Sequence, residues 1–176
     1  MSIMKKYLTL FISIFIAFAL QCTLFKFFSL GKVSPNLLLM LTSLSGFMGG
    51  KKEGMFTGFF AGLFTDILYG NGIIGFSMLL FTWIGYISGL FNRLYYPEDV
   101  KLPLILTIVS DILYGFLYYV FLFLLRSRLD LGFYFIHVIL PEAVYTLIIT
   151  IIIFKPILFL RDLIDDESPE RKASDV

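Results

Sequence analysis

The sequence is poor in cysteine, histidine and charge. It has one cysteine and one histidine among 176 residues, and only 15% of its residues are charged. Cys22 therefore cannot form a disulfide within the chain. The sequence contains no phosphate-binding loop, metal-ligand cluster or dinucleotide fingerprint. These absences give no support to a cofactor or to nucleotide chemistry. The net charge of +1 gives no support to nucleic-acid binding.

What the sequence has in excess is hydrophobic residues. They make up 59% of the chain, including 21 phenylalanines, and the mean hydropathy is +0.90. This composition predicts an all-α integral membrane protein. Apolar runs bounded by charges or turns predict a bundle of six transmembrane helices in a domain of residues 1–160, followed by a disordered cytoplasmic tail at 161–176. The six predicted spans are 7–25, 35–50, 54–69, 72–91, 102–125 and 133–154.

Two of these segments, 35–50 and 54–69, are short for a membrane span. At about 1.5 Å per residue they cross the roughly 30 Å hydrocarbon core only with help from the residues that flank them. A re-entrant hairpin therefore remains an alternative for this pair of segments.

The distribution of lysine and arginine predicts the orientation of the bundle. With a cytoplasmic amino terminus, ten of these residues fall on the cytoplasmic side and four on the opposite side. Because cytoplasmic loops carry the excess of basic residues, both termini are expected in the cytoplasm. The start of the chain also resembles a cleavable signal peptide, with a basic beginning, an apolar run and Ala17-Phe18-Ala19. Since the apolar run continues to Phe25, we expect an uncleaved first span.

Glycines recur at every fourth position from Gly46 to Gly62. In a helix, such residues form a narrow face against which another helix backbone packs closely. The charged residues 51–53 interrupt the series, which therefore predicts two short faces on adjacent helices. We expect a glycine face of the third or fourth span to seat a partner's transmembrane helix, and packing within the chain is the alternative. The glycines concerned are Gly54, Gly58, Gly62, Gly85 and Gly89.

Three acidic residues lie inside the predicted spans, namely Asp66, Asp111 and Glu142. A charge at the centre of a membrane helix costs on the order of 2.5 to 3.5 kcal/mol, so such residues indicate a functional site by default. Helix rise places all three roughly 14 to 18 Å from the cytoplasmic boundary, and we expect them to form an intramembrane polar cluster. The cluster could join helices, bind a ligand, ion or proton, or contact a partner helix. Pro141, next to Glu142, predicts a helix kink.

An enzymatic interpretation finds little support in the sequence. Ser77 and His137 superficially resemble the serine and histidine of rhomboid intramembrane proteases, in which a nucleophile lies within reach of a base. Met78, however, occupies the position where that family has glycine, and no glycine series follows His137. We therefore expect a protein that is not an enzyme.

Several features follow one another in a particular order along the chain. They are a basic start at Lys5-Lys6, the opening Ser34-Pro35-Asn36 of the second span, Gly58-x-x-x-Gly62-x-x-x-Asp66 followed by Gly75, and Pro141 in the last span. Together they resemble the family of the rod-shape-determining membrane protein MreD, over nearly the whole chain. That family often has an acid after the proline of the second span, where this chain has the uncharged Asn36.

The resemblance implies a bacterial inner-membrane scaffold of the machinery for cell elongation and peptidoglycan synthesis. Its partners would be an MreC-like single-span protein and, through it, the MreB filament, the RodA polymerase and the transpeptidase of RodA. The resemblance also implies a fold similar to the substrate-binding subunit of energy-coupling-factor transporters. That likeness supplies the alternative function, a small-molecule, vitamin-type binding subunit of a membrane transporter.

Overall fold

The computed structural model describes residues 3–27, 35–69, 75–94, 100–126 and 131–165. All secondary structure within these ranges is helical. The elements are α1 (Ile3–Phe27), α2 (Leu37–Gly49), α3 (Lys51–Tyr69), α4 (Phe76–Leu90), the 3-10 helix η1 (Phe91–Leu94), α5 (Lys101–Arg126), α6 (Leu131–Tyr134), the π-helix η2 (Phe135–Ile139) and α7 (Leu140–Asp165).

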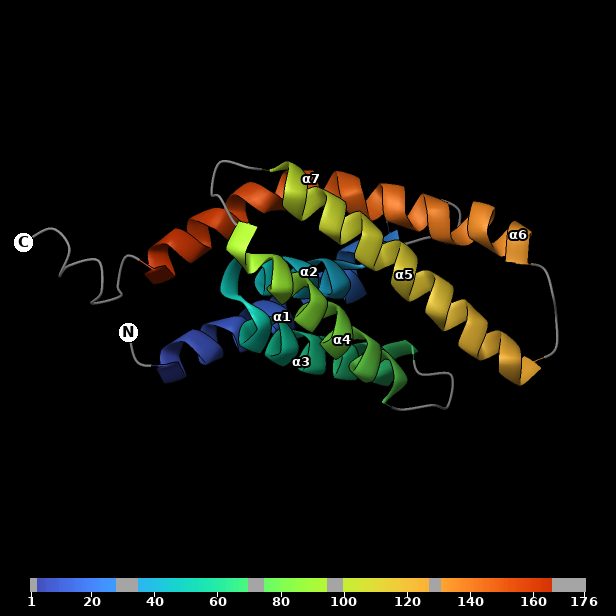
Figure 1. The fold of residues 1–176 in the computed structure, drawn as a ribbon, viewed down its shortest axis with the longest axis horizontal. Coiled ribbons are helices and arrows are strands. Elements are labelled where there is room, and N and C mark those ends of the chain that lie inside the picture. The colour runs from blue at the N-terminus through green and yellow to red at the C-terminus, as the bar shows by residue number, and fades with distance from the viewer. Residues whose placement is uncertain (1–2, 28–34, 70–74, 95–99, 127–130, 166–176) are drawn as a thin grey trace, which may run out of the picture.

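Each predicted span coincides with a helix, and the last one with the uninterrupted run of α6, η2 and α7. The rods run in alternating directions, so that the first residues of α1 and the last residues of α7 lie at the same end of the molecule (Figure 1). Several boundaries differ from prediction, and in α1, α3 and α7 the helix continues past the apolar run. Helix α3 already begins at Lys51, and α7 continues through 161–165, which the sequence had placed in a disordered tail. Residues 166–176 of that tail lie outside the described residues.

Helix α2 lies at the centre of the bundle and contacts α1, α3, α4, α5 and α7. Every residue from Leu37 to Met48 is buried, so this helix lies inside the bundle rather than on its surface. Its 13 residues span only about 20 Å. Because the ends of a helix carry unpaired backbone groups, a short helix inside a membrane protein needs protein partners at both ends.

Polar side chains from other elements supply these partners. At the start of α2, the Asn36 side chain accepts a hydrogen bond from the backbone N–H of Leu39 (3.1 Å), and Gln21 Oε1 of α1 accepts one from Leu38 (3.2 Å). At the other end, Asn92 Nδ2 of η1 donates to the carbonyls of Phe47 and Met48 (2.9 and 2.8 Å). The short α2 is thus capped from both ends by the rest of the chain.

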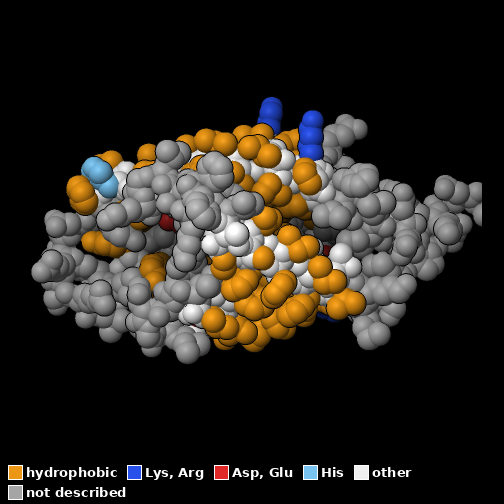
Figure 2. All heavy atoms as spheres, turned by 180° about the vertical axis from the view of Figure 1, so that it is seen from behind, with side chains coloured by type: hydrophobic (Ala, Val, Ile, Leu, Met, Phe, Trp, Pro, Cys, Tyr) orange, Lys and Arg blue, Asp and Glu red, His pale blue; other side chains and the backbone are white. Residues whose placement is uncertain are grey.

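The surface of the bundle is apolar, whereas its interior holds both apolar and polar side chains. Large hydrophobic side chains are exposed on α1, α3, α4, α5 and α7, with Trp83 63% exposed, and they cover much of the described surface in Figure 2. Small hydroxyl residues are buried instead, among them Thr42, Ser43 and Thr107. Three segments, Lys6–Thr23, Lys101–Phe121 and Phe135–Ile157, are long and apolar enough to cross a membrane. Surrounding lipid explains this distribution, because a protein surface that faces lipid needs no polar groups.

Candidate functional site

Asp66, near the end of α3, caps the start of α4. Its carboxylate accepts hydrogen bonds from the backbone N–H groups of Gly75 (2.8 Å), Ser77 (3.1 Å) and Met78 (3.1 Å). These are the first N–H groups of α4, which have no partner within the helix. A negative charge at a helix amino terminus also interacts favourably with the helix dipole. The buried Asp66 therefore links α3 to α4 through these three hydrogen bonds. No other acidic residue takes part in them.

A line of polar groups leads from Asp66 to the other two acids. The Ser77 hydroxyl lies 3.2 Å from the Tyr114 hydroxyl of α5. Tyr114 lies near both Asp66 and Glu142, and Glu142 lies near Asp111. The structure thus places Asp111 and Glu142 near each other, and the hydrogen-bonded contacts from Asp66 extend through Ser77 to Tyr114.

Asp111 is the least satisfied member of this group. It is 4% exposed, and neither carboxylate oxygen has a hydrogen-bond partner within the described part of the chain. Thr146 of α7 lies beside Asp111, although outside hydrogen-bond geometry. The Thr146 hydroxyl accepts a hydrogen bond from the backbone N–H of Asn36 (3.2 Å), just before α2. The polar group therefore extends from α3 and α4 through α5 and α7 to the amino-terminal end of α2.

A second polar contact joins α2, α4 and α5. The Ser43 hydroxyl lies 3.2 Å from that of Ser88, and Ser110 donates to Ser43 at 3.5 Å. Sequence reasoning missed these serines and the backbone partners of Asp66. The available signals were the adjacency of Ser110 to Asp111 and the position of Gly75, at which a positive φ of 106° turns the chain into α4. Neither signal specifies a contact between elements that lie far apart in sequence.

The glycine faces are occupied by the chain's own helices. A Cβ atom at Gly58 or Gly62 of α3 would fall within 3.0 Å of the backbone of α4, and Gly54 and Gly85 meet each other in the same way. Gly89 approaches the backbone of Lys51 equally closely. These faces pack α3 against α4, which corrects the expectation that one of them seats a partner's helix, because no room is left there.

The break within the glycine series lies between α2 and α3. Gly50 separates the two helices and has a φ of 87°, a conformation that glycine adopts without steric cost. Gly46 of α2 and Gly54 of α3 nevertheless face the same residue, Gly85 of α4. The series therefore forms two short faces on adjacent helices, as the charges at 51–53 predicted.

Pro141 lies at the second position of α7, directly after the π-helix η2. Proline has no N–H to donate, and its ring displaces the carbonyl four residues earlier, which here belongs to His137. A π-helical turn accommodates such a mismatch within a continuous helix. The sequence predicted a kink at Pro141; the structure has a five-residue π-helix, η2, just before this residue, and the kink itself stays a prediction.

Ser77 and His137 do not form a nucleophile and base pair. The Ser77 hydroxyl pairs with Tyr114, whereas His137 Nδ1 pairs with the Phe133 carbonyl (3.0 Å). The His137 ring is exposed and stacks on Phe133, with 4.0 Å between the ring centroids. Both side chains are thus engaged within their own surroundings, and this geometry gives no support to serine-protease chemistry.

An apolar exterior, a polar interior and a buried line of carboxyl and hydroxyl groups define the class of this protein as a helical membrane bundle. Within that class, the family model of the rod shape-determining protein MreD matches residues 1–163, and the chain belongs to this family. The family determines rod shape in cells. No curated protein and no solved structure matches the chain, so the likeness to energy-coupling-factor subunits stays a prediction.

Proposed function

We propose that this protein is a non-enzymatic scaffold of the bacterial cytoplasmic membrane. In this role it docks the transmembrane helix of an MreC-like single-span protein and thereby holds the elongation machinery, with MreB, RodA and its transpeptidase, at one place. Membership of the MreD family over residues 1–163 is the observation that carries the proposal. The two termini face the cytoplasm, and all six helical rods cross the membrane.

The polar interior supports a structural role. Asp66 caps α4, and hydroxyl contacts join α2, α4 and α5, so the buried polar groups hold the helices in one arrangement. Hydrogen bonds between membrane helices contribute on the order of 0.6 kcal/mol each. A scaffold needs such a fixed arrangement because its partner recognises an outer surface whose shape depends on the packing beneath it.

The partner's helix must lie on the lipid-facing surface, because the glycine faces are filled. That surface can be sampled with a photo-crosslinking residue placed at one exposed position on each long outer helix. Suitable positions are Phe15 of α1, Trp83 of α4, Ile105 of α5 and Ile152 of α7. The fully buried Phe81 of α4 serves as the control position, because a probe there meets only the chain itself.

We expect crosslinks to a tagged MreC-like protein from one or two neighbouring outer positions and none from Phe81. The experiment uses the full chain in native membranes, followed by purification in mild detergent. A scaffold without a docked helix would give no crosslink from any outer position and no co-purification of the partner. That outcome would refute the proposed docking function, while crosslinks from one helix would assign its face.

A further inference from the structure

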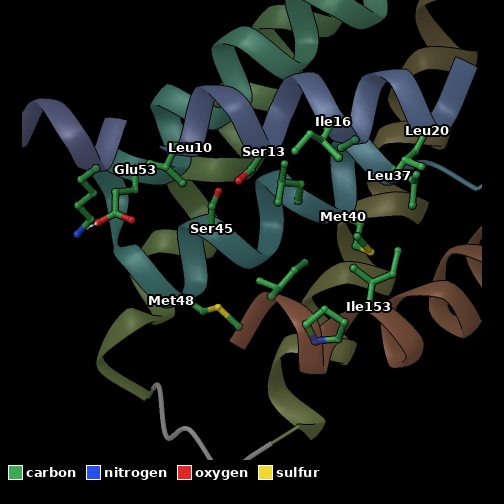
Figure 3. Close-up of a pocket in the computed structure, with 15 residues that line it drawn as sticks. Leu10, Ser13, Ile16, Leu20, Leu37, Met40, Ser45, Met48, Glu53 and Ile153 are labelled. Atoms are coloured by element: carbon green, nitrogen blue, oxygen red, sulfur yellow. Dashed lines mark ion pairs between the residues drawn. The ribbon is translucent and has the colours of Figure 1, made fainter. Parts of the chain in front are cut away.

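A narrow apolar cleft opens between α1 and α7 and has α2 as its floor (Figure 3). Its volume is about 210 Å³. Ile16 and Leu20 line it on the α1 side, Met40 and Leu41 lie on the floor, and Ile153 belongs to α7. Here α1 and α7 leave a gap beside the central helix.

The cleft is too narrow for a helix. The α2 residues on its floor are at most 8% exposed. A helix with its side chains is roughly 10 to 12 Å wide, so a groove that seated one would expose this stripe of α2 far more. The occupant is therefore a thin chain rather than a partner's transmembrane helix.

The lining favours an apolar occupant. Two hydroxyl groups point into the cleft from opposite walls, those of Ser13 and Ser45 (Figure 3). Ser13 Oγ donates to the carbonyl of Thr9 (2.9 Å), and Ser45 Oγ donates to that of Thr42 (3.1 Å). Because both hydroxyl hydrogens are already used within their own helices, neither selects a polar ligand.

One end of the cleft is charged. Lys6 of α1 and Glu53 of α3 form an ion pair there, with 2.5 Å between Lys6 Nζ and Glu53 Oε1. Glu53 is buried, whereas Lys6 is about one-third exposed and retains further N–H donors. Lys6 therefore offers a charged donor to an anionic headgroup at this end of the cleft.

The length of the cleft corresponds to one leaflet of the membrane. Along α1 it extends from Lys6 to Leu20, which is about 21 Å at 1.5 Å per residue. Half of the hydrocarbon core is roughly 15 Å thick, and the headgroup level lies beyond it. We propose that this cleft binds one acyl chain of an anionic phospholipid from the cytoplasmic leaflet, with the lipid phosphate at Lys6. The lipid fills the gap that α1 and α7 leave beside α2.

Native mass spectrometry of the full chain tests this assignment. Protein purified in mild detergent is mixed with phosphatidylglycerol or phosphatidylcholine. The lipid molecules that stay bound after activation in the mass spectrometer are then counted. Ser13→Phe should fill the cleft from the α1 wall and lower retention of phosphatidylglycerol roughly tenfold, equivalent to about 1.4 kcal/mol of lost packing. Ser45→Leu, which fills the cleft from its floor, should act in the same direction. Ala19→Phe is the matched control, because Ala19 is exposed on α1 outside the cleft.

The headgroup assignment has a separate readout. The wild-type chain should retain phosphatidylglycerol roughly fivefold better than phosphatidylcholine, as expected for one lysine near an anionic headgroup. The double variant Lys6→Gln with Glu53→Gln keeps the net charge and should lose this preference. If Ser13→Phe and Ser45→Leu retained as much phosphatidylglycerol as the wild type, the cleft would not be the lipid site. An equal loss of phosphatidylglycerol in Ala19→Phe would lead to the same conclusion. An unchanged preference in the double variant would overturn the role of Lys6.

Discussion

The contact between α3 and α4 makes Gly58 a position at which one methyl group has a large structural consequence. Its Cβ would fall within 3.0 Å of the carbonyl of Phe81 and the amide of Thr82, and both of these are backbone groups that cannot rotate away. Gly58→Ala therefore forces α3 and α4 apart along their shared face. Overpacking of this kind costs about 1 to 3 kcal/mol. Further loss follows from every dispersion contact that the separation lengthens.

Gly115 of α5 provides the matched control. Its Cβ would also be close to a neighbour, at 3.1 Å, but that neighbour is the side chain of Ile139 and not backbone. Both substitutions gain the same helix propensity, about 1 kcal/mol for alanine over glycine, so this gain cancels in the comparison. The difference in stability between Gly58→Ala and Gly115→Ala thus isolates the backbone clash, which we expect to be about 1 to 3 kcal/mol.

Thermal unfolding of the purified variants in one detergent measures this difference. For a chain of this size, 1 kcal/mol shifts the Tm by roughly 2 to 4 °C, so Gly58→Ala should melt several degrees below Gly115→Ala. Equal melting temperatures would contradict the close backbone contact. If Gly58→Ala were as stable as the control but no longer co-purified with an MreC-like partner, the glycine face would be a docking surface after all.

Three further predictions concern capping and topology. Asp66→Leu should destabilise the bundle by about 3 to 9 kcal/mol, because three N–H groups at the start of α4 lose their acceptor at roughly 1 to 3 kcal/mol each, whereas Asp66→Asn should be milder since it keeps one acceptor oxygen; equal melting temperatures would argue against the cap. Asn92→Leu should cost about 1 to 3 kcal/mol by leaving the last carbonyls of α2 unpaired, and an unchanged Tm would show that they find other partners. Reporter fusions should show an uncleaved chain with alternating locations, and an outside location for the carboxyl terminus or a mature mass without the first nineteen residues would exclude this topology. Fusions should report inside at Lys52, Pro97 and Val176 and outside at Lys32 and Leu129.

The sequence alone was sufficient for the features that depend on local composition. Apolar runs located all six helical segments, because a chain in lipid must satisfy its backbone within each segment. The charges at 51–53 marked the break between α2 and α3. The family resemblance was also legible from short motifs, since Gly58, Gly62, Asp66 and Gly75 follow a fixed spacing, and the family match confirmed it.

Only the tertiary structure decided what those residues contact. The period of four in the glycines shows that a helix approaches closely, but not whether that helix belongs to this chain or to a partner. The depth of Asp66 suggested a cluster of acids, yet its carboxylate caps α4, because the first N–H groups of α4 lie beside the end of α3. The burial of the short α2 on all sides likewise depends on five other helices, and no local pattern encodes their arrangement.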